Sequence, residues 1–260
     1  MTVAPPETAA WIERLARLGY AAKGLLYATI AVLAGRAAIG LGGGTTDTGG
    51  AMRAIAGAPF GRTMLSLSAL GLVGYSVWRV IAAIADTERR GKDLKGLTLR
   101  TSFLVRAIFH LILAYSAVRV ALGMRAISRR NLSVAADYGD LILFGIGAGF
   151  AGYGVYQLYR SWTAKLSKQI DHQEMKREAG HWVYPIARFG IAARGVVFCL
   201  IGYLSLKASV TARADSGGGL RESLQMFADV GRIPLLVAAA GLLAYAFYEV
   251  LNVRYRDIRT

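Results

Sequence analysis

The chain has 260 residues, of which 55% are hydrophobic, and its mean hydropathy is +0.41. This apolar fraction exceeds that of soluble domains and predicts an integral membrane protein. Its 31 Lys and Arg residues against 16 Asp and Glu give a net charge of +15. Because these cations lie between apolar runs rather than on one polar face, we expect a membrane surface as the partner and no nucleic acid.

The cysteine and histidine content restricts cofactor chemistry. Cys199 is the single cysteine, so one chain cannot build a disulfide framework or a cysteine-based metal site. Of the three histidines only His110 falls in an apolar segment, which excludes an intramembrane bis-histidine haem within one chain. We therefore expect no cofactor and no metal.

A short amphipathic stretch is followed by six long apolar runs. Residues 1–18 place Trp11 and Leu15 at helical spacing opposite charged residues, which predicts a short interfacial helix. The apolar runs are 20–41, 63–85, 103–123, 141–159, 190–210 and 233–253. Each is about 20 residues long, enough to cross a ~30 Å hydrocarbon core as an α-helix. A basic start before an apolar run also fits a signal peptide.

The odd-numbered runs share one motif. It begins at Arg17 as RLGYAAKGLLY, returns at Arg188 as RFGIAARGVVF, and appears in a weaker form at Arg100 as RTSFLVRAIFH. In each copy a cation lies six residues before a second cation. Internal repeats of this kind decide the fold. Since the first copy recurs deep in the chain, we expect a retained transmembrane helix rather than a cleaved signal.

The even-numbered runs repeat as closely. In each, a glycine is followed by a second glycine after ten residues, a tyrosine after fourteen and another aromatic residue after seventeen. The three sets are Gly61, Gly71, Tyr75 and Trp78; Gly139, Gly149, Tyr153 and Tyr156; and Gly231, Gly241, Tyr245 and Tyr248. The unit is therefore a two-helix hairpin used three times, at about 11–87, 94–165 and 182–258.

We predict an all-α integral membrane protein that forms a single membrane domain over residues 1–260. Its six transmembrane helices form three tandem hairpin repeats with pseudo-three-fold symmetry about the membrane normal. An odd number of parallel repeats differs from the inverted repeats of many secondary transporters.

In the first repeat, the resemblance to a known family lies in the motif that begins at Arg17, in the segment Pro59-Phe60-Gly61-Arg62, and in the later Gly71-Leu72, Gly74-Tyr75 and Trp78-Arg79. With these residues the chain resembles the bacterial membrane family called domain of unknown function 1206. The resemblance covers nearly the whole chain. The second repeat departs most, with Ser102 in place of the motif's glycine and His110 in place of its tyrosine. The resemblance implies six membrane helices and supplies no activity.

Two outer loops also match each other. Asp47-Thr48-Gly49-Gly50 and Asp215-Ser216-Gly217-Gly218 each have an arginine six residues after the aspartate, at Arg53 and Arg221. Each glycine-rich turn leads into a brief amphipathic stretch that we expect on the membrane surface.

The distribution of cations predicts the orientation. The termini and the loops after the second and fourth runs carry 19 Lys and Arg residues, and the opposite side carries 11. Cytoplasmic loops are the ones enriched in cations. We therefore expect a multi-pass protein of the bacterial cytoplasmic membrane with both termini in the cytoplasm.

The segment from Gly147 to Gly152 matches the glycine spacing of a dinucleotide-binding fingerprint. That fingerprint requires a strand before it, whereas this segment lies within an apolar run. We interpret it, together with Gly154, as small-residue helix packing through two pairs, Gly145 with Gly149 and Ala148 with Gly152. The other even-numbered helices also carry small residues, so we expect these three helices to pack closely together.

Two sets of cations are equivalent by repeat. Lys23, Arg106 and Arg194 lie near the cytoplasmic ends of the odd-numbered helices. Thirteen residues later come Arg36, Arg119 and Lys207, about 20 Å further along each helix. One interpretation is that each side chain reaches the nearest headgroup layer separately. The other is that repetition gathers one set into a ring that binds an anion or an acidic lipid headgroup.

A third repeated position is polar within the membrane. Arg79, Gln157 and Glu249 each follow the shared aromatic residue, and we expect His110 at a similar depth. Polar groups so placed face the interior of a bundle. Arg79 and Glu249 are predicted to form an ion pair, which fits either a structural role or a proton path.

Nothing in the spacing of nucleophiles, bases or metal ligands supports catalysis, so we assign no catalytic residue and do not expect an enzyme. One hypothesis is a small transport or channel-like protein with anion or acidic-lipid binding at the cation sets. The alternative is a non-catalytic lipid-binding or scaffold subunit of a membrane complex. The expected partners are acidic membrane lipids, together with a membrane-protein partner or a second copy. A continuous polar path favours transport, and a dry axis favours the scaffold.

Overall fold

A computed structural model describes residues 6–41, 44–87, 91–126, 139–163, 183–210 and 220–256. In these ranges the regular elements are helices. They are α1 (Pro6–Ala38), α2 (Thr48–Ala56), α3 (Gly61–Ile84), α4 (Leu94–Ala121), α5 (Gly139–Trp162), α7 (Val183–Val210), α8 (Leu220–Val230) and α9 (Arg232–Tyr255).

Five of these helices are long and apolar enough to cross a membrane. Within the described ranges they cover Glu13–Ala38, Gly61–Ile84, Gly96–Ala121, Val183–Val210 and Arg232–Tyr255. The fourth apolar run forms α5, which is 24 residues long. The protein is thus an all-helical chain with the helices of a multi-pass membrane protein.

The amino-terminal helix differs from the expected short interfacial one. α1 runs without a break through 33 residues, from Pro6 to Ala38, and so joins the amphipathic stretch to the first apolar run. At 1.5 Å per residue it is about 50 Å long, which exceeds the thickness of the hydrocarbon core. Continuation costs little because the sequence between the two parts contains neither proline nor a turn signal.

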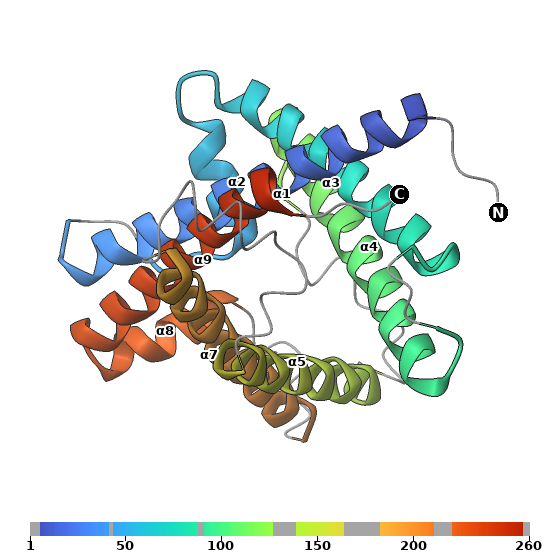
Figure 1. The fold of residues 1–260 in the computed structure, drawn as a ribbon. Helices are drawn as coiled ribbons and strands as arrows, with labels where there is room; N and C mark the ends of the chain where they lie inside the picture. Colours follow the sequence, from blue (N-terminus) through green and yellow to red (C-terminus); the bar gives the residue numbers. More distant parts are fainter. Residues whose placement is uncertain are drawn as a thin grey trace.

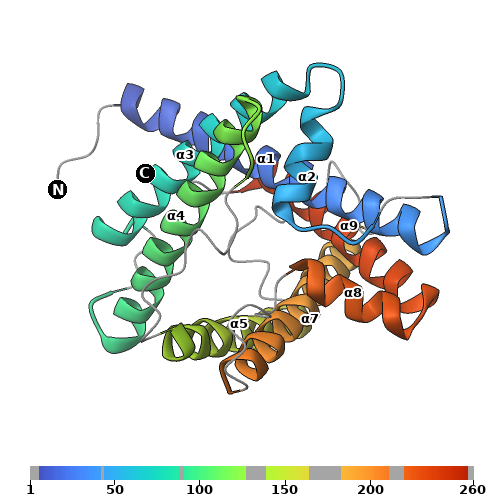
Figure 2. The same ribbon diagram turned by 180° about the vertical axis from the view of Figure 1, so that it is seen from behind.

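The long helices pack in three pairs, and these pairs form the sides of a triangle (Figures 1 and 2). The pairs are α1 with α9, α3 with α4, and α5 with α7. Each pair joins the second helix of one repeat to the first helix of another. Two corners are closed, where α1 packs on α3 and α7 packs on α9. At the third corner, α4 and α5 do not pack along each other within the described residues.

This arrangement corrects the expected packing of the even-numbered helices. The even-numbered runs form α3, α5 and α9, the second helix of each repeat. In the described part of the chain these three helices do not pack on one another, and each lies against α1, α4 or α7, the first helices of the repeats. A Cβ added to Gly71 on α3 would lie 2.7 Å from the backbone nitrogen of Gly19 on α1. A Cβ added to Gly202 on α7 would lie 2.6 Å from the backbone nitrogen of Ala151 on α5. The small residues therefore join the second helix of a repeat to a first helix.

The glycines of α5 pack against a helix as expected, but not through the two predicted pairs. Gly147 and Gly154 are the residues at which α7 approaches, each within 3 Å of an added Cβ. In the described ranges no atom lies within 4 Å of a Cβ added to Gly145, Gly149 or Gly152. The sequence alone could not separate these two faces because both consist of small residues.

The two short amphipathic elements exist as helices. Asp47 caps α2, since its carboxylate accepts a hydrogen bond of 2.7 Å from the backbone nitrogen of Gly50. Met52 and Ile55 of α2 and Leu224 of α8 are buried in one apolar cluster with α1, α7 and α9. The matching Asp215 turn lies outside the described residues.

Candidate functional site: a tyrosine–cation centre

Each repeat places its cation over its own tyrosine. The Lys23 ammonium lies 4.3 Å from the centroid of the Tyr75 ring. The guanidinium carbon of Arg106 lies 5.4 Å from the ring of Tyr153, and that of Arg194 lies 4.5 Å from the ring of Tyr245. These are cation–π distances. We call the six residues Lys23, Arg106, Arg194, Tyr75, Tyr153 and Tyr245 the tyrosine–cation centre.

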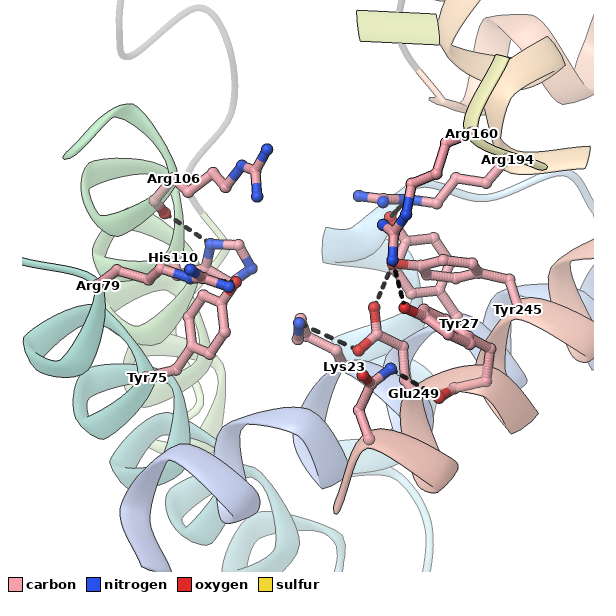
Figure 3. Close-up of polar contacts among 12 residues, drawn as sticks. Lys23, Tyr27, Tyr75, Arg79, Arg106, His110, Arg160, Arg194, Tyr245 and Glu249 are labelled. Carbon is pink, nitrogen blue, oxygen red and sulfur yellow. Dashed lines mark hydrogen bonds and ion pairs between the residues drawn. The ribbon is translucent and has the colours of Figure 1, made fainter. Parts of the chain in front are cut away.

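The residue four positions after each cation packs on a tyrosine of the neighbouring repeat. His110 lies 4.6 Å from Tyr75 between ring centroids, Phe198 lies 5.4 Å from Tyr153, and Tyr27 lies 4.9 Å from Tyr245. Each tyrosine is therefore held between a cation of its own repeat and an aromatic ring of another. The centre joins all three helix pairs, and its side chains point toward one another in the middle of the bundle (Figure 3).

One buried carboxylate, Glu249, contacts two residues of the centre. Glu249 pairs with Lys23, whose Nζ lies 3.1 Å from Oε2, and the hydroxyl of Tyr245 donates to the other carboxylate oxygen. The predicted ion pair of Glu249 with Arg79 is replaced by this one. Figure 3 places Arg79 beside Tyr75, where its Nε donates to the tyrosine hydroxyl over 3.1 Å. Packing of α1 between α3 and α9 brings Lys23 nearer to Glu249.

Arg106 and Arg194 have no carboxylate partner within the described residues. Both guanidinium groups approach the ring of Tyr153, at 5.4 and 5.8 Å from its centroid. Arg194 donates to the hydroxyl of Tyr27 over 3.0 Å, a neutral partner. Among the described residues the two half-buried cations thus face one aromatic ring, and neither forms a salt bridge.

Helix α5 adds one further polar side chain near this position. Gln157 is buried, and its Oε1 has no hydrogen-bond partner in the described part of the chain. Its Cβ lies 3.2 Å from a Cβ added to Gly195, the residue after Arg194. Arg79, Gln157 and Glu249 are all buried, as expected for polar groups that face a bundle interior.

The three repeats of this geometry coincide with three segments that match a known family. The model of the family described as Domain of Unknown Function (DUF1206) matches residues 18–86, 101–164 and 189–256. The chain belongs to this family. Each matched segment contributes one cation and one tyrosine of the centre. The internal repeats are therefore a property of the family's own pattern.

A relative in Bacillus subtilis (strain 168), described as "Uncharacterized protein YxxB", is 30% identical over 259 residues. The match covers 97% of this chain and 94% of the relative. No solved structure matches the chain.

The arginine that begins each odd-helix motif caps a helix of the neighbouring repeat. Arg100 donates to the carbonyl oxygens of Ala83 and Ile84, over 2.6 and 2.9 Å. Arg188 does the same for α5 at Ser161 and Trp162, and Arg17 for α9 at Val253 and Arg254. Helix carboxyl ends leave carbonyl groups without partners, and these guanidinium groups satisfy them. These arginines are recognisable in the sequence as repeated positions, but their capping role depends on the helix packing.

The second cation set does not gather. Arg36, Arg119 and Lys207 lie in the last turns of α1, α4 and α7. Arg36 donates to the carbonyl oxygen of Leu41 over 3.2 Å, and Arg119 to that of Arg125 over 3.0 Å. Arg36 and Lys207 are exposed. In the first set, by contrast, each cation lies over the tyrosine of its own repeat, and Arg106 and Arg194 share the ring of Tyr153.

Proposed function

We propose that this protein binds an anion within the membrane at the tyrosine–cation centre. In this proposal six helices cross the bacterial cytoplasmic membrane as three hairpins around a pseudo-three-fold axis, with both termini in the cytoplasm. The 19-to-11 split of cations and the equivalent contacts in each repeat support this arrangement.

The observation that carries the proposal is the approach of Arg106 and Arg194 to one ring, Tyr153. Charged groups inside a membrane protein require a partner, because uncompensated charge is costly at low dielectric. Glu249 is already paired with Lys23. An anionic ligand such as a phosphate group would neutralise the two guanidinium groups, and arginine is suited to bind phosphate in a bidentate manner.

The packing on the far side of the centre favours binding over a permanent channel. Toward α2 and α8 the middle of the bundle holds a buried apolar cluster that includes Leu26, Ile30, Ile201 and Leu242. Such a layer offers no polar groups to an ion. This supports a lipid-binding or scaffold role, the alternative to transport, with acidic lipid or another membrane protein as partner.

The test compares two double variants that lose the same charge. Arg106→Gln/Arg194→Gln changes the centre, and Arg36→Gln/Arg119→Gln changes cations outside it. The detergent-purified proteins are heated with inorganic phosphate or with chloride at equal ionic strength. We expect phosphate to raise the Tm of the parent and of the control variant. Each lost cation should weaken binding about five-fold, from ~1 kcal/mol per cation, so the centre variant should respond little. An equal rise in both variants would contradict the proposal.

A further inference from the structure

We infer that the corner between α4 and α5 is a lateral entrance through which the phosphate headgroup of an acidic phospholipid reaches the centre. The inference rests on the proposed anion site and names its ligand. It starts from the corner of the helix triangle at which, among the described residues, the two helices do not pack along each other.

Repeat-equivalent residues show that this corner has the surfaces needed to close. Gly71 of α3 lies against Leu18 and Gly19 of α1 at the first corner, and Gly241 of α9 lies against Ala193 of α7 at another. Gly149 holds the same place in the second repeat, yet no described residue lies within 4 Å of its added Cβ. Small residues are therefore present at a corner where none of the described helices occupies the space beside them.

Side chains of α4 and α5 are also more exposed at this corner than their equivalents at the closed corners. Tyr156 of α5 is 47% exposed, whereas the equivalent Trp78 and Tyr248 are 1% and 3% exposed. Val105 of α4 is 61% exposed, and its equivalent Ala22 is 3% exposed. Both faces of the open corner are therefore apolar or aromatic, which suits acyl chains rather than a hydrated ion.

The charge at this corner is complementary to a phospholipid headgroup. Arg106 is carried by α4 and reaches across to the ring of Tyr153 on α5. It lies beside the exposed Val105 and has no carboxylate partner in the described ranges. A lipid with its chains along α4 and α5 would place its phosphate at Arg106, with Arg194 next to it across Tyr153. Free phosphate has no such apolar requirement, so the geometry points to the lipid.

The experiment fills the corner with a large side chain. Gly149→Trp adds bulk where the described residues leave space, and Val155→Trp places the same side chain at an exposed position of the same helix. Both variants and the parent are reconstituted in nanodiscs of phosphatidylglycerol and phosphatidylcholine, released, and examined by native mass spectrometry. Size-exclusion profiles and Tm show that each variant is folded.

We expect the parent and Val155→Trp to retain phosphatidylglycerol in preference to phosphatidylcholine, and Gly149→Trp to lose this preference. Equal retention by the two tryptophan variants would overturn the entrance. If the parent retains no phosphatidylglycerol but inorganic phosphate still raises its Tm, the ligand is a soluble anion, and this inference fails while the proposed function stands. If neither ligand has an effect, the proposed function fails as well.

Discussion

Arg188 donates to the carbonyl oxygen of Ser161 over 2.7 Å, and so the first helix of the third repeat caps the last helix of the second. The two residues lie 27 positions apart, whereas the equivalent Arg100 and Ala83 lie 17 apart. The connecting segments differ in length, but the contact is the same. A constant arginine therefore ties successive repeats together at the end of the bundle nearest the tyrosine–cation centre.

Replacement of this cap should destabilise the protein. Arg188→Met leaves the carbonyl groups of Ser161 and Trp162 without their charged donor, and a hydrogen bond to a charged group contributes about 1.5–3 kcal/mol. We expect a clear fall in Tm, with Arg188→Lys intermediate because lysine lacks the fork that reaches two carbonyls. Arg62→Met, which removes an exposed cation, is the control. Thermal unfolding in detergent measures both, and equal Tm values for the two methionine variants would refute the cap.

Glu249 should have opposite effects on stability and on anion binding. Glu249→Gln leaves the buried Lys23 without its ion-pair partner, and breaking such a buried pair costs about 3–5 kcal/mol. The same change removes a negative charge beside the centre, so phosphate should raise the Tm of this variant more than that of the parent. A Lys23→Met/Glu249→Gln double variant removes both charges and should recover much of the lost stability. Failure to recover it would show that the Lys23–Glu249 pair is not the source of the effect.

The repeats in the sequence show which positions of the centre are equivalent, but not which of these side chains contact each other. Repeat spacing alone marks Lys23, Arg106 and Arg194, and separately marks the three tyrosines. That each cation lies over the tyrosine of its own repeat depends on how α1 crosses α3, and no periodicity within one helix encodes a crossing. The ion pair was assigned to Arg79 instead of Lys23 for the same reason. By contrast, the approximate positions of the long helices, the three-fold repetition and the family followed from local patterns.

The glycines give a direct test of the packing that sequence analysis missed. Gly202→Leu places a side chain against the backbone of Ala151, whereas Gly149→Leu projects to where no described residue lies within 4 Å of its Cβ. Overpacking of a close helix contact costs about 1–3 kcal/mol or more. We expect Gly202→Leu to reduce the yield of monodisperse protein strongly and Gly149→Leu to leave it near the parent's. The reverse order would restore the packing expected from sequence and remove the open corner.

The orientation in the membrane can be tested with single cysteines. Arg17 of α1 donates to the carbonyl oxygen of Arg254 at the end of α9 over 2.8 Å, so the start of α1 and the end of α9 lie on one side of the bundle. The excess of cations predicts that this side is cytoplasmic.

Two single-cysteine variants in a Cys199→Ser background test this orientation. Gly44→Cys lies in the loop before α2, where no described residue is near its Cβ, and Lys92→Cys lies exposed in the loop before α4. A membrane-impermeant maleimide applied to intact cells should label Gly44→Cys and leave Lys92→Cys unlabelled until the cells are opened. Reporter fusions after Thr260 and within residues 89–95 should agree by registering as cytoplasmic. Labelling of Lys92→Cys in intact cells would invert the topology, and it would place the capped end of the bundle and the tyrosine–cation centre toward the outer leaflet.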